Sequence, residues 1–174
     1  MTTEQGPSKA ELLEALRTSE RYVLDKLQAL PEEEFEQGRY ENGWNGRQIL
    51  AHVASIEWTY PRLVDLAKGT AQPSGGQPAS APPAAARPTA IARGGIIDYN
   101  ERQVEKRADA SVTELVTEFQ QNRAATIAAV EGTNDALLSK EIRSAGGIQG
   151  TLGSVINAVA VLHVIGHTND ITGA

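Results

Sequence analysis

The segment Thr151–Ile171, TLGSVINAVAVLHVIGHTNDI, carries two of the three histidines in this chain of 174 residues and decides how the rest is interpreted. His163 and His167 stand four residues apart, so in a helix they lie on one face, one turn above the other. Apolar side chains share that face, namely those of Leu152, Ile156 and Val159. We therefore expect both imidazoles to point into the interior of the protein.

Three further segments show the apolar spacing of amphipathic helices. The first runs from a capping box at Ser8 to about Leu30, the second from Asn45 to Gly69, and the third, in two pieces, from Ile96 to Gly132. Pro61 falls inside the second segment and predicts a kink. Between Thr133 and Gly150 we expect a loop with a helical turn. Together with the terminal segment, these helices predict an all-α fold, a four-helix bundle.

The third histidine, His52, lies on the apolar side of the second helix. At about 1.5 Å per residue, it lies roughly 10 Å from the start of that helix, and His163 and His167 lie roughly 13 and 7 Å from the end of theirs. These levels match if helices 2 and 4 are antiparallel, which predicts an up-down-down-up topology. The Pro/Ala/Gly-rich segment 72–93 would supply the long crossover between helices 2 and 3. We expect residues 1–174 to form a single domain.

Three histidines on apolar helix faces indicate a divalent metal site. Catalytic zinc sites take three protein ligands and leave one position for water or substrate. The alternative is that each is a core histidine satisfied by another group. Burying three unpaired imidazoles would cost on the order of several kcal/mol, and a shared ion removes that cost. The His-x-x-x-His pair also occurs in metalloproteases, but these need glutamate where Val164 stands, so that class is excluded.

The composition excludes several other classes of function. A net charge of −6 and the absence of a basic cluster argue against nucleic-acid binding. No apolar stretch is long enough to cross a membrane and no signal peptide is recognisable, so we expect a cytoplasmic protein. The chain has no cysteine and therefore no thiol nucleophile of its own.

Three motifs, in this order, carry a resemblance to a known family: GWNGRQILAHVASIE at 43–57, IIDYNERQVEKR at 96–107 and HVIGH at 163–167. They resemble the DinB/YfiT-like superfamily, and within it the N-terminal domain type of the mycothiol-dependent maleylpyruvate isomerases. The resemblance implies a helical bundle, often a homodimer, with a divalent metal ion held by one histidine of helix 2 and two ligands of helix 4. By position these are the three histidines named above. The expected ion is zinc or nickel.

The resemblance also implies a class of reaction. The expected protein is a metal-dependent enzyme that uses a low-molecular-weight thiol as cosubstrate for S-transfer or isomerisation of a small electrophile. Two alternatives remain open. One is a hydrolase of a small reactive compound, in which the open metal position carries hydroxide. The other is a non-catalytic dimeric bundle with a structural metal or none.

Candidate residues around the site follow from their places in the sequence. Glu57 and Asp170 are the carboxylates nearest to the histidines and are candidate general bases, and Asp170 could instead orient a ligating imidazole. Candidate substrate contacts are Trp58, Tyr60, Arg93 and Asn100. Core packing is the alternative role for the two aromatic residues, and surface solvation is the alternative for the arginine.

Overall fold

The computed structural model describes residues 6–38, 43–70 and 95–173. These residues are mostly helical, as the all-α prediction requires. The helices of the first half are α1 (Lys9–Gln28), the 3-10 helix η1 (Glu32–Glu36), α2 (Gly46–Glu57), α3 (Pro61–Lys68) and α4 (Gly95–Glu105). The second half holds α5 (Val112–Glu131), α6 (Asp135–Leu138), β1 (Glu141–Arg143), β2 (Gln149–Thr151), α7 (Leu152–Ile156), the π-helix η2 (Asn157–Leu162) and α8 (His163–Thr172). The segment 72–93, predicted as a crossover, lies outside the described residues.

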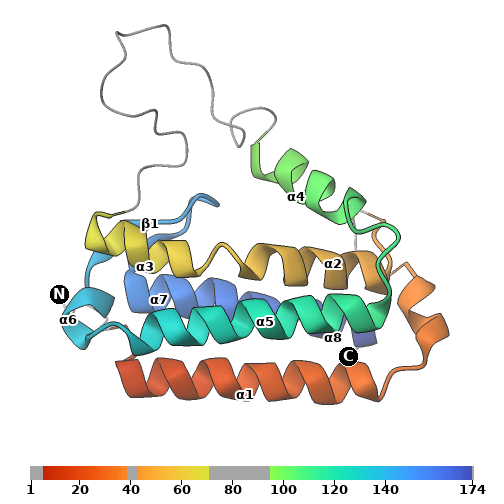
Figure 1. Cartoon of the computed structure of the whole chain (residues 1–174), viewed down its shortest axis with the longest axis horizontal. Coiled ribbons are helices and arrows are strands. Elements are labelled where there is room, and N and C mark those ends of the chain that lie inside the picture. Colours follow the sequence, from red (N-terminus) through yellow and green to blue (C-terminus); the bar gives the residue numbers. More distant parts are fainter. Residues whose placement is uncertain (1–5, 39–42, 71–94, 174) are drawn as a thin grey trace, which may run out of the picture.

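Four helical rods lie side by side: α1, α2 with α3, α5, and α7 with η2 and α8 (Figure 1). Both α1 and α2 pack against α5 and α8, so each rod has two neighbours. The second and last rods run in opposite directions, because α3, which follows α2, contacts α7, which precedes α8. This antiparallel arrangement is the one required to bring His52 level with His163 and His167.

The helix boundaries follow from local residues. α1 begins at the predicted capping box, and α2 and α5 begin at capping boxes as well, so that Ser8, Asn45 and Ser111 each accept a hydrogen bond from the backbone N–H three residues on. At the predicted kink the helix breaks: α2 ends at Glu57 and α3 begins with Pro61. Proline is tolerated at this first position because its missing N–H would have had no helical partner.

In the segment 133–150 the predicted helical turn is confirmed, but a hairpin replaces the rest of the predicted loop. The segment contains the short helix α6 and most of a hairpin in which β1 and β2 pair antiparallel, with Ile142 opposite Gly150. The turn includes Gly147 at a φ of +87°, a conformation that glycine adopts at no steric cost. Strands of three residues are too short to show a clear alternation of apolar and polar side chains, so the sequence pattern did not reveal them.

The last rod also differs, because its middle third is π-helical rather than α-helical. The N–H of His163 donates to the carbonyl of Ala158, five residues back instead of four. The burial pattern explains this geometry, since a row at four-residue spacing is fully buried: Leu152, Ile156, Ala160, Val164 and Thr168. In a regular α-helix such a row drifts by about 40° per step and leaves the core. The wider turn of η2 compensates for that drift.

The apolar core consists of two clusters of buried residues. One includes Ile49, Phe119 and Ile171, from α2, α5 and α8. The other includes Val64 and Val130, from α3 and α5, together with residues of α1, α7 and η2. Among the described residues, no helix is long and apolar enough to cross a membrane.

Candidate metal centre

The structure brings the three histidines together. His52 comes from α2, and His163 and His167 come from the first two turns of α8. One nitrogen from each ring can be chosen so that all three lie within 4.8 Å of one another. The ring centroids are 5.4 Å apart for His52 and His163, 5.2 Å for His52 and His167, and 4.4 Å for His163 and His167. The imidazoles can therefore present three nitrogens to a common point.

Burial keeps two of these rings in the form that binds metals. It lowers the pKa of His52 to about 3 and that of His163 to about 4, and the neighbouring His167 adds to both shifts. The cause is the cost of charging an imidazole away from water and beside another imidazole. At neutral pH both rings therefore carry the free lone pair that coordination requires.

The donor set fits a divalent ion. The Nδ1 atom of His52 is buried and has no hydrogen-bond partner among the described residues. Buried polar atoms rarely lack a partner, because an unsatisfied group costs free energy. Three neutral imidazoles with an open fourth position are a usual ligand set for catalytic zinc. An ion at the common point of the three rings would thus account for both the unpartnered nitrogen of His52 and the convergence of three imidazoles.

Asp170 orients one of the three rings. Its Oδ2 lies 3.0 Å from Nδ1 of His167, one turn back in α8. Because this contact engages Nδ1, Nε2 is the nitrogen of this ring that would coordinate an ion. A carboxylate on the far nitrogen of a ligating histidine fixes its tautomer and raises its basicity.

The histidines lie in the wall of a cavity of about 250 Å³. Its lining is formed by Trp44, His52, Ile97, Asn100, Glu101, His163 and His167. The cavity reaches the surface, because Ile97 is 70% exposed. Trp44 lies against His52, with 5.4 Å between the ring centroids. A small molecule in this cavity would therefore touch the histidines on one side and α4 on the other.

The predicted substrate contacts separate into two groups. Asn100 lines the cavity, whereas Trp58 and Tyr60 are not part of its lining. Trp58 is 38% exposed, and the guanidinium of Arg62 lies 4.0 Å from its ring centroid. Tyr60 is buried in the core. Arg93 lies outside the described residues.

Glu57 also lies away from the cavity lining. Its side chain is fully buried, and its Oε1 lies 2.9 Å from Nε of Arg123 on α5. Burial raises the pKa of Glu57 to about 7, while the charge of Arg123 opposes that shift. A carboxylate sealed against an arginine cannot reach a substrate in the cavity, so we assign Glu57 no role as a base there.

Three residues of the lining were missed by the sequence analysis: Trp44, Ile97 and Glu101. Ile97, Asn100 and Glu101 are spaced by three and four residues and so share one face of α4, a signal that was available once Asn100 had been selected. Trp44 directly precedes the N-cap of α2. Only the three-dimensional arrangement places it beside His52.

Residues 15–171 match the family model of the DinB superfamily. The crystal structure of a mycothiol-dependent maleylpyruvate isomerase is similar, with a TM-score of 0.71 and 18% identity over 98% of this chain and 63% of that one. The structure of its histidine-to-alanine mutant gives a TM-score of 0.67 and 17% identity over 95% of this chain and 62% of that one. The chain thus spans less than two thirds of the length of these isomerases, and the likeness is one of fold. No curated protein sequence matches. Because the family model covers nearly all of the sequence, the chain belongs to the DinB superfamily.

Proposed function

We propose that this protein is a divalent-metal-dependent enzyme that uses a low-molecular-weight thiol for S-transfer or isomerisation of a small electrophile. The observation that carries the proposal is the convergence of three imidazoles in the wall of a surface cavity. Membership of the DinB superfamily and the fold shared with a mycothiol-dependent isomerase support it. Because the chain has no cysteine, the thiol must come from a cosubstrate.

In this proposal the metal ligands are His52, His163 and His167, and Asp170 orients the third of them. A divalent ion at these rings favours the thiolate form of a bound thiol. The protein side chains supply the surroundings. Trp44, which packs against His52, excludes water from one side of the cavity, and the amide of Asn100 can form hydrogen bonds to a polar group of the substrate.

We also infer the finer features that the sequence predicted. The four rods correspond to a four-helix bundle of up-down-down-up topology, with residues 72–93 as its crossover and residues 1–174 as one domain. Their packing and directions support this topology. The expected ion is zinc or nickel, and the expected assembly is a cytoplasmic homodimer that acts on a small molecule and binds no nucleic acid.

A second candidate function, metal-dependent hydrolysis of a small reactive compound, is favoured by one observation. Glu101 is a carboxylate in the lining of the histidine cavity. Hydrolysis at a divalent ion requires a group that takes a proton from water, and a carboxylate within reach of the substrate can do so. Replacing Glu101 with glutamine would abolish hydrolysis but leave thiol binding intact.

The test begins with elemental analysis of the purified protein and continues with the cobalt-substituted form. Mycothiol, bacillithiol and glutathione are titrated in turn while the visible absorption of Co²⁺ is followed. We expect one thiol to add an intense sulfur-to-cobalt band, and a His163→Ala variant to bind no cobalt. A cobalt spectrum that no thiol changes would exclude the thiol-dependent reaction and leave hydrolysis. Failure of the wild-type protein to bind any divalent ion would exclude both.

A further inference from the structure

The π-helix η2 ends where the first histidine of α8 begins, and its geometry leaves one carbonyl without its usual donor. In an α-helix the N–H of His163 would donate to the carbonyl of Val159, four residues back. Here it donates to Ala158 instead. The carbonyl of Val159 must therefore find another partner.

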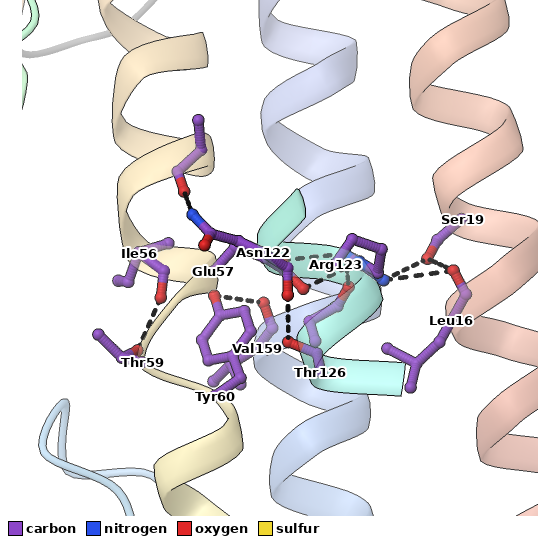
Figure 2. A network of polar contacts seen from close by, with 12 residues as sticks. Leu16, Ser19, Ile56, Glu57, Thr59, Tyr60, Asn122, Arg123, Thr126 and Val159 are labelled. Carbon is purple, nitrogen blue, oxygen red and sulfur yellow. Dashed lines mark hydrogen bonds and ion pairs between the residues drawn. The ribbon is translucent and has the colours of Figure 1, made fainter. Parts of the chain in front are cut away.

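A side chain from another rod supplies that partner. The hydroxyl of Tyr60, in the turn between α2 and α3, donates to the carbonyl of Val159 at 2.8 Å (Figure 2). Tyr60 is only 3% exposed, so water cannot easily replace this bond. The next carbonyl, that of Ala160, accepts a hydrogen bond of 2.6 Å from Nη2 of Arg123. Two consecutive carbonyls of η2 are thus held by side chains outside their own helix.

The guanidinium of Arg123 is itself fixed to the other rods. Its side chain is fully buried, and Nη1 donates to the carbonyl of Leu16 at 3.3 Å and to Oγ of Ser19 at 3.1 Å, both on α1 (Figure 2). On α2 it pairs with Glu57, with Nη2 donating to Oε2 at 3.1 Å. Because Arg123 itself lies on α5, the position of η2 depends on contacts with all three other rods.

The direction of the two histidines depends on η2. Each residue of an α-helix turns the chain by about 100°. The wide turn of η2 accommodates roughly one residue more than an α-helical turn would. If η2 became α-helical, α8 would rotate by about 100° relative to α7, and His163 and His167 would no longer face His52.

We propose that Tyr60 is a positioning residue for the metal centre. Its hydroxyl, together with Arg123, holds η2 in π-helical geometry and so directs His163 and His167 toward His52. The inference rests on the proposed function to the extent that these histidines bind the ion. Tyr60 neither lines the cavity nor belongs to the three ligands, so this role goes beyond the proposed function.

The variant Tyr60→Phe tests this role, because it removes the hydroxyl and leaves the ring to pack. We expect the Kd for Co²⁺ to rise by about 10- to 100-fold, as when an outer partner of a ligand is lost. The visible bands of bound Co²⁺ should also shift, which reports altered ligand geometry rather than altered stability. Wild-type affinity and spectrum in Tyr60→Phe would overturn the proposal.

Tyr22→Phe is the matched control. It also removes a phenolic hydroxyl that bonds to the last rod, but the acceptor is the side chain of Asn169 rather than a carbonyl of η2. We expect it to leave the Kd and the cobalt bands unchanged. Equal effects of the two variants would mean that any loosening of the last rod impairs the site, and would overturn the specific role of Tyr60.

Amide hydrogen exchange of the metal-free protein separates this proposal from the proposed function. Residues 159–164 should exchange at least about tenfold faster in Tyr60→Phe than in Tyr22→Phe or in the wild type. Unchanged exchange would overturn the role of Tyr60, whether or not the wild type binds metal. A wild type that binds no ion, with faster exchange in Tyr60→Phe, would instead refute the metal function alone. Should Tyr60→Phe not fold, Arg123→Lys, which keeps the charge beside Glu57 but loses the guanidinium fork, carries the same expectations.

Discussion

Two buried polar clusters lie between α2 and the last rod, and they differ in how their polar atoms are satisfied. In the histidine cluster (His52, His163 and His167), Nδ1 of His52 has no partner among the described residues, and the rings line a cavity. In the arginine cluster (Glu57, Tyr60 and Arg123), the charges meet each other and backbone carbonyls, sealed from water. Burial alone does not distinguish a functional site from a structural one. Nor does the lack of a hydrogen bond alone, because Oε1 of Glu57 and Nε of Arg123 also make none, although they form an ion pair of 2.9 Å. What sets the histidine cluster apart is a buried nitrogen with neither a hydrogen bond nor an opposite charge beside it, as at Nδ1 of His52.

The largest effect on stability is expected in the arginine cluster. Arg123→Met leaves the carboxylate of Glu57 buried without its partner, which costs about 3–5 kcal/mol. Urea denaturation at pH 7 measures the loss as a lower midpoint at constant slope. The control is Arg17→Met, because the ion pair of Arg17 with Glu131 is about half exposed and is worth less than about 1 kcal/mol. Equal losses in the two variants would show that the arginine cluster is not a structural centre.

At the histidine cluster, a bound metal ion should instead stabilise the folded protein. A divalent ion at about 100 times its Kd should raise the free energy of unfolding by about 2.7 kcal/mol. For a chain of this size that corresponds to a rise in Tm of roughly 5–11 °C in a thermal melt. His52→Ala should show no such rise, whereas Arg17→Met should show all of it. A rise that persists in His52→Ala would place the ion elsewhere.

A smaller effect should follow from loosening one ring of the histidine cluster. Asp170→Asn weakens the contact that orients His167, and we expect metal affinity to fall by about 10- to 100-fold. Isothermal titration with Zn²⁺ would measure it. Asp65→Asn, an exposed change on α3, serves as the control and should bind like the wild type. An unchanged affinity in Asp170→Asn would remove Asp170 from the site.

The smallest effect is a dependence of stability on pH in the metal-free protein. His52 and His163 stay neutral in the fold, at pKa values of about 3 and 4, while in the unfolded chain they take up protons near the ordinary value of 6.5. The contribution of these two rings to the free energy of unfolding is therefore fully present above pH 6.5 and is lost as the pH falls below it. Between pH 7 and pH 5.5 the loss is about 1 kcal/mol for each ring.

Comparison with a variant isolates this contribution. Glu57 acts in the opposite direction, because its raised pKa favours the folded state more at low pH than at high pH. Denaturation of His52→Gln at both pH values should show a smaller loss on acidification than the wild type, by about 1 kcal/mol. Identical pH dependence in the two proteins would mean that His52 takes up a proton in the fold as readily as in the unfolded chain.

The helices and the histidines could be predicted because their signals are local. Capping boxes at Ser8, Asn45 and Ser111 mark helix starts within four residues, and the spacing of His163 and His167 places both on one face. The bond between His167 and Asp170 is local as well. Each of these features depends on residues that are neighbours in the chain.

The rest depends on contacts between distant segments. The π-helix could have been suspected from the apolar row at four-residue spacing from Leu152 to Val164, but the donors that satisfy it come from Tyr60 and Arg123. Arg123 lies on the same stripe as Phe119 and Val130, and a charge at such a position implies a buried partner. That partner, Glu57, is 66 residues away in the sequence. No local pattern joins the two.

The walls of the cavity have separate origins. The nitrogens that face each other come from α2 and α8, whereas Ile97, Asn100 and Glu101 come from α4, which packs against α2. Substitutions on the inner side of α4 can therefore alter the range of molecules admitted without disturbing the imidazoles. In the proposed enzyme, the shape of the cavity and the set of metal ligands are therefore properties that can change independently of each other.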